Sequence, residues 1–286
     1  MTAASTPLAA RMGDFWNFDQ TADLLSRGFV QNSLIALALL GLIGGLLGPM
    51  IVARQLSFAV HGASELSFTG AAAAMLAGIS VNTGGVIGAV VAAAVFGFLG
   101  NRARERDSVI GVVMAFGLGL GVLFLHLHGR TGTGFALLTG QSASITDEGL
   151  RAVAITAAVV VVVLAVIYRP LLFASLDPRV AAASGVPMRT LSVVFAILVG
   201  LAAAQGVQII GALLVMSLLI TPAAAAARLS ANPTVVLALS VLFAELAAVG
   251  GLILSLAPEL PVSVLVTTIS FVIYLLCRLF GLRARS

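Results

Sequence analysis

Long runs of hydrophobic residues follow one another along the chain, separated by short polar segments. A helix that spans a lipid bilayer needs roughly 20 apolar residues. Candidate runs extend over residues 29–53, 58–79, 86–100, 109–127, 153–168, 191–205, 209–227, 235–256 and 262–279. Because one or two of these runs need not cross completely, the pattern predicts an all-α polytopic membrane protein with about eight or nine transmembrane helices.

Composition supports this fold class. Hydrophobic residues make up 60% of the 286 residues and charged residues 9%, whereas about a quarter of a soluble domain is charged. The segments between runs are too short to fold a separate aqueous core. We therefore expect one transmembrane domain over residues 29–280, a leader over residues 1–28 and a tail over residues 281–286. The aromatic residues at 15, 16 and 18 leave two readings of the leader open, an interfacial segment or a disordered one.

The net charge of +4 comes from 15 arginines, since the chain has no lysine. The arginines lie at the ends of hydrophobic runs, which gives no support for nucleic-acid binding. Cytoplasmic loops concentrate positive charge, so Arg179, Arg228 and Arg278 predict a cytoplasmic C-terminus in a protein of the cytoplasmic membrane. Arg54 and the arginines at 102, 104 and 106 lie on the same, cytoplasmic side only if the N-terminus is outside. The sequence does not decide whether the number of spans is odd or even, so the side of the N-terminus stays open.

His61 and Glu65 are the first candidates for metal binding. They are four residues apart in an otherwise apolar run, so a helix places both on one face. Imidazole and carboxylate together suit zinc, manganese or iron, and Ser64, Ser67 and Thr69 add oxygens nearby. The alternative is a buried hydrogen-bonded pair that locks two helices together.

Other polar residues in the apolar runs are secondary candidates. His126 and His128 are two residues apart and point roughly 200° away from each other on a helix, which favours solvation at the interface over a shared ion. Glu245 lies near the middle of its run and should face a cavity or a polar partner. These three residues are secondary pore candidates, whereas Gln205 and Gln208 favour hydrogen bonding between helices.

A short amphipathic segment over residues 175–189 is predicted to form a cytoplasmic helix. Asp177 caps its start and Pro178 occupies its first turn, while Gly185 ends it. A rigid helix there can transmit force from a cytosolic partner. The chain itself has no glycine-rich loop ending in Gly-Lys-Ser/Thr, so any energy input must come from elsewhere.

Four segments together resemble the membrane subunits of ABC importers for zinc and manganese. They are GGLLGPMIVARQLSF (44–58), LLTGQSASITDEGL (137–150), LDPRVAAASGVP (176–187) and GALLVMSLLITPAAAA (211–226). That family carries an aspartate and a histidine four residues apart after its first arginine. Here His61 stands in the place of the aspartate and Glu65 in that of the histidine, while Thr69 replaces a proline.

The resemblance implies a type II ABC importer permease without a resident cofactor or catalytic residues of its own. It also implies two copies of the chain around one pore, an ATP-binding subunit in the cytoplasm and an extracytoplasmic metal-binding protein. On this reading His61 and Glu65 are transient metal ligands. Asp177, Pro178, Ala181, Gly185 and Val186 receive the ATPase stroke, and Gly211 and Pro222 shape a helix that lines the path.

The sequence therefore predicts import of a transition-metal dication, zinc or manganese with iron as a third candidate, by alternating access. One alternative is a permease for metal chelates or a vitamin, in which His61 and Glu65 would barely matter. A second is a proton-coupled secondary transporter that uses Glu245 or Glu65. An intramembrane enzyme is disfavoured because the chain has no zinc-protease HExxH motif.

Overall fold

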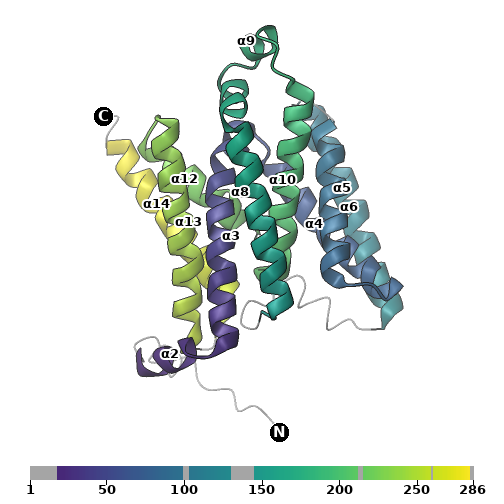
Figure 1. The fold of residues 1–286 in the computed structure, drawn as a ribbon, viewed down its shortest axis with the longest axis vertical. Helices are drawn as coiled ribbons and strands as arrows, with labels where there is room; N and C mark the ends of the chain where they lie inside the picture. The colour runs from purple at the N-terminus through teal and green to yellow at the C-terminus, as the bar shows by residue number, and fades with distance from the viewer. Residues whose placement is uncertain (1–17, 99–102, 130–144, 212–214, 259, 284–286) are drawn as a thin grey trace.

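The computed structural model describes residues 18–98, 103–129, 145–211, 215–258 and 260–283, and it confirms the all-α fold (Figure 1). Seven helices are long and apolar enough to cross a membrane. They are α3 (Gly28–Ala53), α5 (Val81–Phe98), α6 (Ala103–His128), α8 (Asp147–Leu176), α10 (Met188–Ile209), α13 (Pro233–Leu256) and α14 (Val262–Arg283). The shorter elements are α2 (Phe18–Leu25) and α9 (Pro178–Ala183).

Two further passes are less regular. Helix α4 (Ser57–Ala77) is as long as a membrane span but is more polar, since it carries His61 and Glu65. The run predicted over residues 209–227 is not one helix: in the described residues it forms α11 (Val215–Leu219) and α12 (Thr221–Leu229), after α10 has ended at Ile209. This run is one of those that need not be a complete span. A left-handed glycine at 211 follows the end of α10, and α11 and α12 meet at Ile220, whose N–H still bonds the carbonyl oxygen of Met216 at 3.0 Å.

Contacts between helices show that the passes alternate in direction. Helix α3 begins beside α2 at one end of the molecule, and α9 lies at the other end (Figure 1). Gly70 and Gly88 bring α4 and α5 together antiparallel, whereas α4 runs parallel to α6, with Gly62 against Ile110 and Gly121 against Phe68. If α11 and α12 are taken as one pass, the described chain crosses between the two ends nine times, so α2 and the end of α14 lie at opposite ends.

Glycines in α3 allow its neighbours to approach closely. A Cβ on Gly45 would lie 2.5 Å from Cα of Val241 in α13, and one on Gly48 would lie 2.7 Å from the carbonyl oxygen of Leu219 in α11. Small residues give this close approach in membrane helices because apolar burial alone does not drive them together. These close contacts at glycines place α3 at the centre of a group with α11, α12 and α13.

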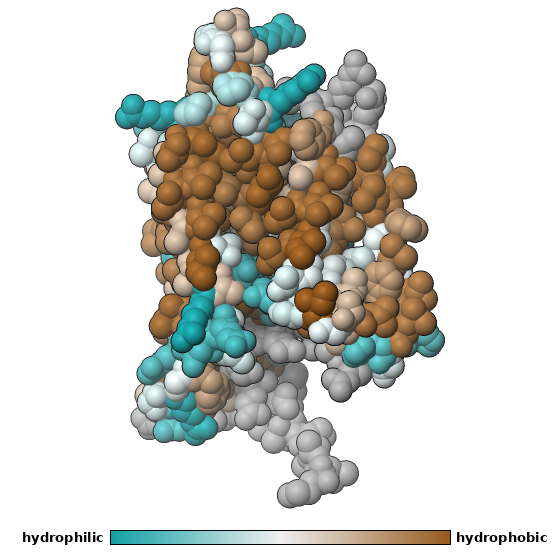
Figure 2. All heavy atoms as spheres, turned by 45° about the vertical axis from the view of Figure 1, so that its right-hand side comes forward, coloured by the Kyte–Doolittle hydropathy of each residue, from teal (hydrophilic) through white to brown (hydrophobic). Residues whose placement is uncertain are grey.

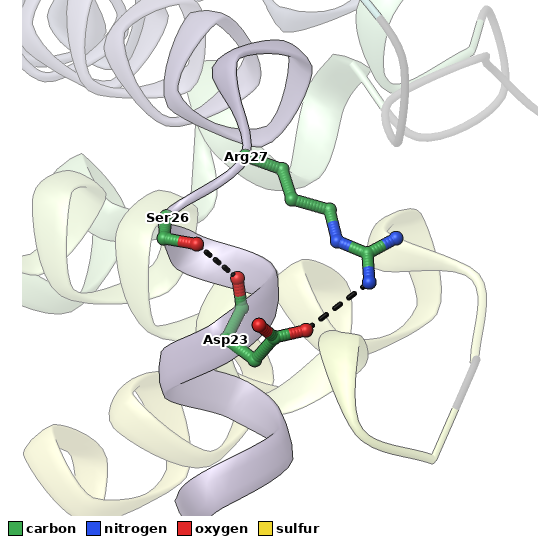
Figure 3. A network of polar contacts seen from close by, with 3 residues as sticks. All are labelled: Asp23, Ser26 and Arg27. Atoms are coloured by element: carbon green, nitrogen blue, oxygen red, sulfur yellow. Dashed lines mark hydrogen bonds and ion pairs between the residues drawn. The ribbon is translucent and has the colours of Figure 1, made fainter.

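The junction of α2 and α3 is closed by local polar contacts (Figure 3). The Arg27 guanidinium lies 3.1 Å from the Asp23 carboxylate, and Ser26 Oγ donates to the Asp23 carbonyl at 2.6 Å. Both charged side chains are exposed, so the pair contributes little to stability. It links the last turn of α2 to the residue before α3 and offsets the positive charge of Arg27.

The surface is divided into polar ends and an apolar middle. Figure 2 shows a broad band of hydrophobic side chains with hydrophilic residues above and below it. Exposed apolar residues on the outer helices, such as Val112, Phe116 and Val166, contribute to the apolar surface. A surface of this kind matches the hydrocarbon layer of a bilayer.

Candidate functional site

His61 and Glu65 lie on one face of α4, in its second and third turns. Glu65 is 3% exposed and His61 is half-buried. Neither side chain makes a hydrogen bond in the described part of the chain, and both His61 Nδ1 and Glu65 Oε2 are shielded from solvent. The His61 ring packs on Phe58, with 6.4 Å between ring centres. A buried polar atom without a partner is costly, so the pair does not have the contacts of a structural hydrogen-bonded lock.

The hydroxyl groups near this pair serve the backbone. Ser64 Oγ donates to the carbonyl oxygen of Val60 at 2.9 Å, and Thr69 Oγ1 bonds the carbonyl oxygen of Gly117 in α6 at 2.7 Å. Ser67 faces α5, where its Oγ lies 3.2 Å from the position of a Cβ on Gly85. Ser67 is thus turned toward α5, and the Ser64 and Thr69 hydroxyls each donate to a carbonyl oxygen, which does not use their oxygen lone pairs.

One chain offers few metal ligands. Among the described residues no group of three or more His, Cys, Asp and Glu side chains could hold a metal ion. His61 and Glu65 supply one nitrogen and one carboxylate, and a divalent transition metal takes four or more ligands. A metal held by this pair would need water or a second chain to complete its coordination.

The secondary pore candidates lie on other helices than the His61–Glu65 pair. His126 and His128 occupy the last turn of α6, at the end of the molecule opposite α9, where His126 is exposed. Glu245 of α13 lies beside α3, with its carboxyl carbon 3.4 Å from the position of a Cβ on Gly41. Helix α4 packs against α5, α6, α10 and α11, whereas α13 packs against α2, α3, α11, α12 and α14. Glu245 therefore belongs to a different group of helices from His61 and Glu65.

The short helix predicted within residues 175–189 is present as α9. Asp177 Oδ1 accepts hydrogen bonds from the backbone N–H groups of Arg179 and Val180, at 3.1 and 3.0 Å, and Pro178 is its first residue. Gly185 follows in the left-handed region with φ +84°. The cap and stop predicted from the sequence are thus confirmed. Ala181 is fully buried, and the rest of α9 protrudes at the upper end in Figure 1.

Gly211 and Pro222 each end or begin a helical segment. Gly211 has φ +101°, and its N–H bonds the carbonyl oxygen of Gly206 at 3.2 Å where α10 ends. Pro222 is buried in the first turn of α12. The N–H groups of a first turn have no partner within their helix, so the missing N–H of proline costs α12 no hydrogen bond. Between them, α11 packs against α3, α4, α10, α13 and α14. The two residues therefore set the ends of a central segment and do not sit within one continuous helix.

Two polar features near the other end link α5, α8 and α10. Gln208 Nε2 donates to Asn82 Oδ1 at 2.7 Å, which confirms its predicted role between helices. Gln205 is 3% exposed and lines a pocket of about 140 Å³ with Thr146 and Gln208. Sequence reasoning did not predict Asn82 as a partner, because it falls before the predicted start of its hydrophobic run.

Arg54 also makes contacts that the sequence did not predict. Its Nη2 donates to Ser192 Oγ at 2.6 Å, and its guanidinium lies 5.9 Å from the ring centre of Phe195. Ser192 and Phe195 lie in α10, and Ser192 is 138 residues after Arg54 in the chain. The signal in the sequence was only an arginine at the end of a hydrophobic run.

Comparisons with known proteins show which family and which proteins the chain is similar to. The family model described as "ABC 3 transport family" matches residues 26–281. The manganese transport system membrane protein MntC of Halalkalibacterium halodurans is 31% identical over 83% of this chain and 81% of its own length. The manganese import system permease protein ScaB of Streptococcus parasanguinis is 26% identical over 87% of this chain and 89% of its own length.

Solved structures share the fold. PsaBC from Streptococcus pneumoniae in complex with Fab superposes with a TM-score of 0.83 at 22% identity, over 94% of this chain and 100% of that chain. An inward-facing conformation of a putative metal-chelate type ABC transporter gives 0.68 at 18% identity, over 98% of each chain. The structural matches support the fold, and the family model covers nearly the whole chain: the protein belongs to the ABC 3 transport family.

Proposed function

We propose that the protein is the permease subunit of an ABC importer for a transition-metal dication, with manganese as the leading cargo. The observation that carries this proposal is the His61–Glu65 pair: a nitrogen and a carboxylate on one buried face, without hydrogen bonds to the described residues. Ionisable groups inside a membrane protein are costly and usually mark a transport path. The manganese-transport names of the relatives MntC and ScaB support the choice of cargo.

The pair is suited to passage and not to storage. Two ligands per chain bind a dication weakly, and two copies of the chain would supply four ligands around a shared path. Four ligands replace much of the water shell of an ion and still allow release, which transport requires. Imidazole and carboxylate also accept zinc and iron, so the cargo has to be tested metal by metal.

We assign the α9 end to the cytoplasm. Arginines gather at this end, whereas Arg27 and Arg151 lie at the other. Those at the α9 end include Arg54, Arg169, Arg179, Arg189, Arg228 and Arg278. Positive charge marks cytoplasmic loops. The ATP-binding subunit then docks on α9, and a metal-binding protein delivers the ion at the α2 end.

Uptake of radioactive manganese, zinc and iron by cells that lack their own importers tests the proposal. Cells with the wild-type chain and its partner subunits should accumulate manganese, and His61→Ala with Glu65→Ala should abolish it. Glu148→Ala removes an exposed carboxylate outside α4 and is the matched control. Normal uptake of every metal by the double variant, still inserted and assembled, would show that the ligand role is wrong.

The same experiment separates the alternatives. A permease for metal chelates or a vitamin would tolerate the loss of His61 and Glu65, since its cargo brings its own ligands. A proton-coupled transporter would work without the ATP-binding subunit and would stop when the proton gradient is collapsed. Uptake that depends on the ATP-binding subunit and on both ligands supports the metal importer.

A further inference from the structure

Arg54 joins the turn between α3 and α4 to the beginning of α10. The Nη2 group donates to Ser192 Oγ at 2.6 Å, and the guanidinium carbon lies 5.9 Å from the centre of the Phe195 ring. Ser192 and Phe195 are three residues apart, so they share a face of α10 and hold the guanidinium from one side. A hydrogen bond and a cation–π contact together constrain the position of the group.

The turn that carries Arg54 is tight. Leu56 N–H bonds the carbonyl oxygen of Ile51 at 2.9 Å, and Gln55 lies in the left-handed region with φ +54°. A residue other than glycine holds this conformation only where its surroundings impose it. Helix α4 begins two residues later, and His61 lies in its second turn. Arg54 and His61 are therefore joined by a short, ordered segment.

The other side of the contact leads to α9. Val186 N–H bonds the carbonyl oxygen of Ala181 at 3.1 Å, which folds the link between α9 and α10 back on α9. Helix α10 starts at Met188, and both Val186 and Met188 pack against the hydrophobic core. Ser192 lies in the second turn of α10. A short folded link thus connects α9 to the part of α10 that holds Arg54.

We propose that Arg54 is a positioning residue that couples α9 to the metal ligands of α4, with Ser192 and Phe195 as its receptor on α10. This inference rests on the proposed function. Arg54 touches no ion itself. It makes the start of α10 and the start of α4 move as one unit, so that the stroke of the ATP-binding subunit changes the position of His61.

The amount of manganese transported per ATP hydrolysed tests the inference. It is measured for the whole transporter, reconstituted in vesicles with its ATP-binding and metal-binding subunits. Manganese uptake and phosphate release are measured in the same vesicles. We expect Arg54→Met to lower the manganese carried per ATP about tenfold, within the range of coupling between protein sites, while ATP hydrolysis continues. Arg278→Met removes an exposed arginine from α14 and should leave the ratio unchanged.

Conservative variants separate coupling from a simple charge anchor. Arg54→Lys keeps the charge but loses the planar guanidinium that donates to Ser192 and lies beside the Phe195 ring, and we expect it to lower the ratio as well. A wild-type ratio in Arg54→Lys or Arg54→Met would overturn the proposal. Loss of uptake and ATP hydrolysis in equal proportion would also overturn it, because that result indicates a merely structural role.

A distance measurement makes the test independent of the cargo. Spin labels are placed at Ser57→Cys and Thr190→Cys in a Cys277→Ser background, and their separation is measured with and without ATP. We expect one narrow distance in both states for the otherwise wild-type chain, and a shift or a broad distribution with ATP when Arg54→Met is added. An unchanged distance in that variant would overturn the proposal even if no manganese were transported.

Discussion

Gly45 of α3 and Val241 of α13 are in backbone contact: a Cβ on Gly45 would lie 2.5 Å from Cα of Val241 and 2.9 Å from its nitrogen. The atoms that block this position belong to the main chain and cannot rotate away. Any side chain at residue 45 must therefore push the two helices apart. This contact helps to hold the group of helices around α3.

Gly45→Ala should destabilise the protein by about 1–3 kcal/mol, the usual cost of overpacking. Thermal unfolding of the purified chain in detergent measures the effect as a lower midpoint. Gly119→Ala is the matched control, because Gly119 of α6 has nothing within 4 Å of its added Cβ. Equal midpoints for the two variants would contradict the packing described for α3.

Exchanging the two candidate ligands should preserve transport. His61→Asp with Glu65→His keeps one carboxylate and one imidazole on the same face of α4 and restores the order that the family resemblance implies. We expect manganese uptake within about threefold of wild type, whereas His61→Ala with Glu65→Ala should lose tenfold or more, roughly the loss seen when groups around a metal are removed. Equal loss in both double variants would show that more than ligand type matters here.

Asp177→Ala should loosen the start of α9. The two hydrogen bonds from Arg179 and Val180 to the carboxylate disappear, and loss of such a cap costs about 1 kcal/mol. Hydrogen exchange of the Val180 amide should become faster, and less ATP-binding subunit should copurify with the permease. Asp177→Asn retains a capping oxygen and should behave as wild type. Unchanged exchange in Asp177→Ala would refute the cap.

The two ends of the molecule should face opposite sides of the membrane. In a Cys277→Ser background, a thiol introduced at Ser184→Cys, beside α9, should react with a membrane-impermeant reagent only after the cells are opened. A thiol at Glu148→Cys, near the start of α8, should react in intact cells that retain only the plasma membrane barrier. The reverse pattern would invert the assignment of the cytoplasmic side, which rests on the arginines.

Several helix boundaries differ from the hydrophobic runs for identifiable reasons. Helix α5 begins at Val81, five residues before its predicted run, because Asn82 is accommodated by its bond to Gln208. Helix α8 starts where Thr146 caps it and continues beyond Arg169 to Leu176. Hydropathy detects residues that match lipid, and it does not register polar residues that find partners inside the protein.

The candidate site shows the same division. The spacing of His61 and Glu65 was sufficient to predict a shared helix face, and Asp177, Pro178 and Gly185 were sufficient to predict α9. The surroundings of each residue were not predictable. The Thr69 hydroxyl donates to the carbonyl oxygen of Gly117, 48 residues away. This pairing depends on how α4 packs against α6.

The sequence by itself determined that this is a helical membrane protein with a capped surface helix and a candidate metal pair, because each of these features depends on local composition or on spacing within one turn. Only the tertiary structure decided that the chain passes nine times between two ends within its described residues, with the break before α11, and that Arg54 meets Ser192. Such relationships join segments far apart in the chain. They follow from close packing of small residues between helices, which no periodicity in a single segment encodes.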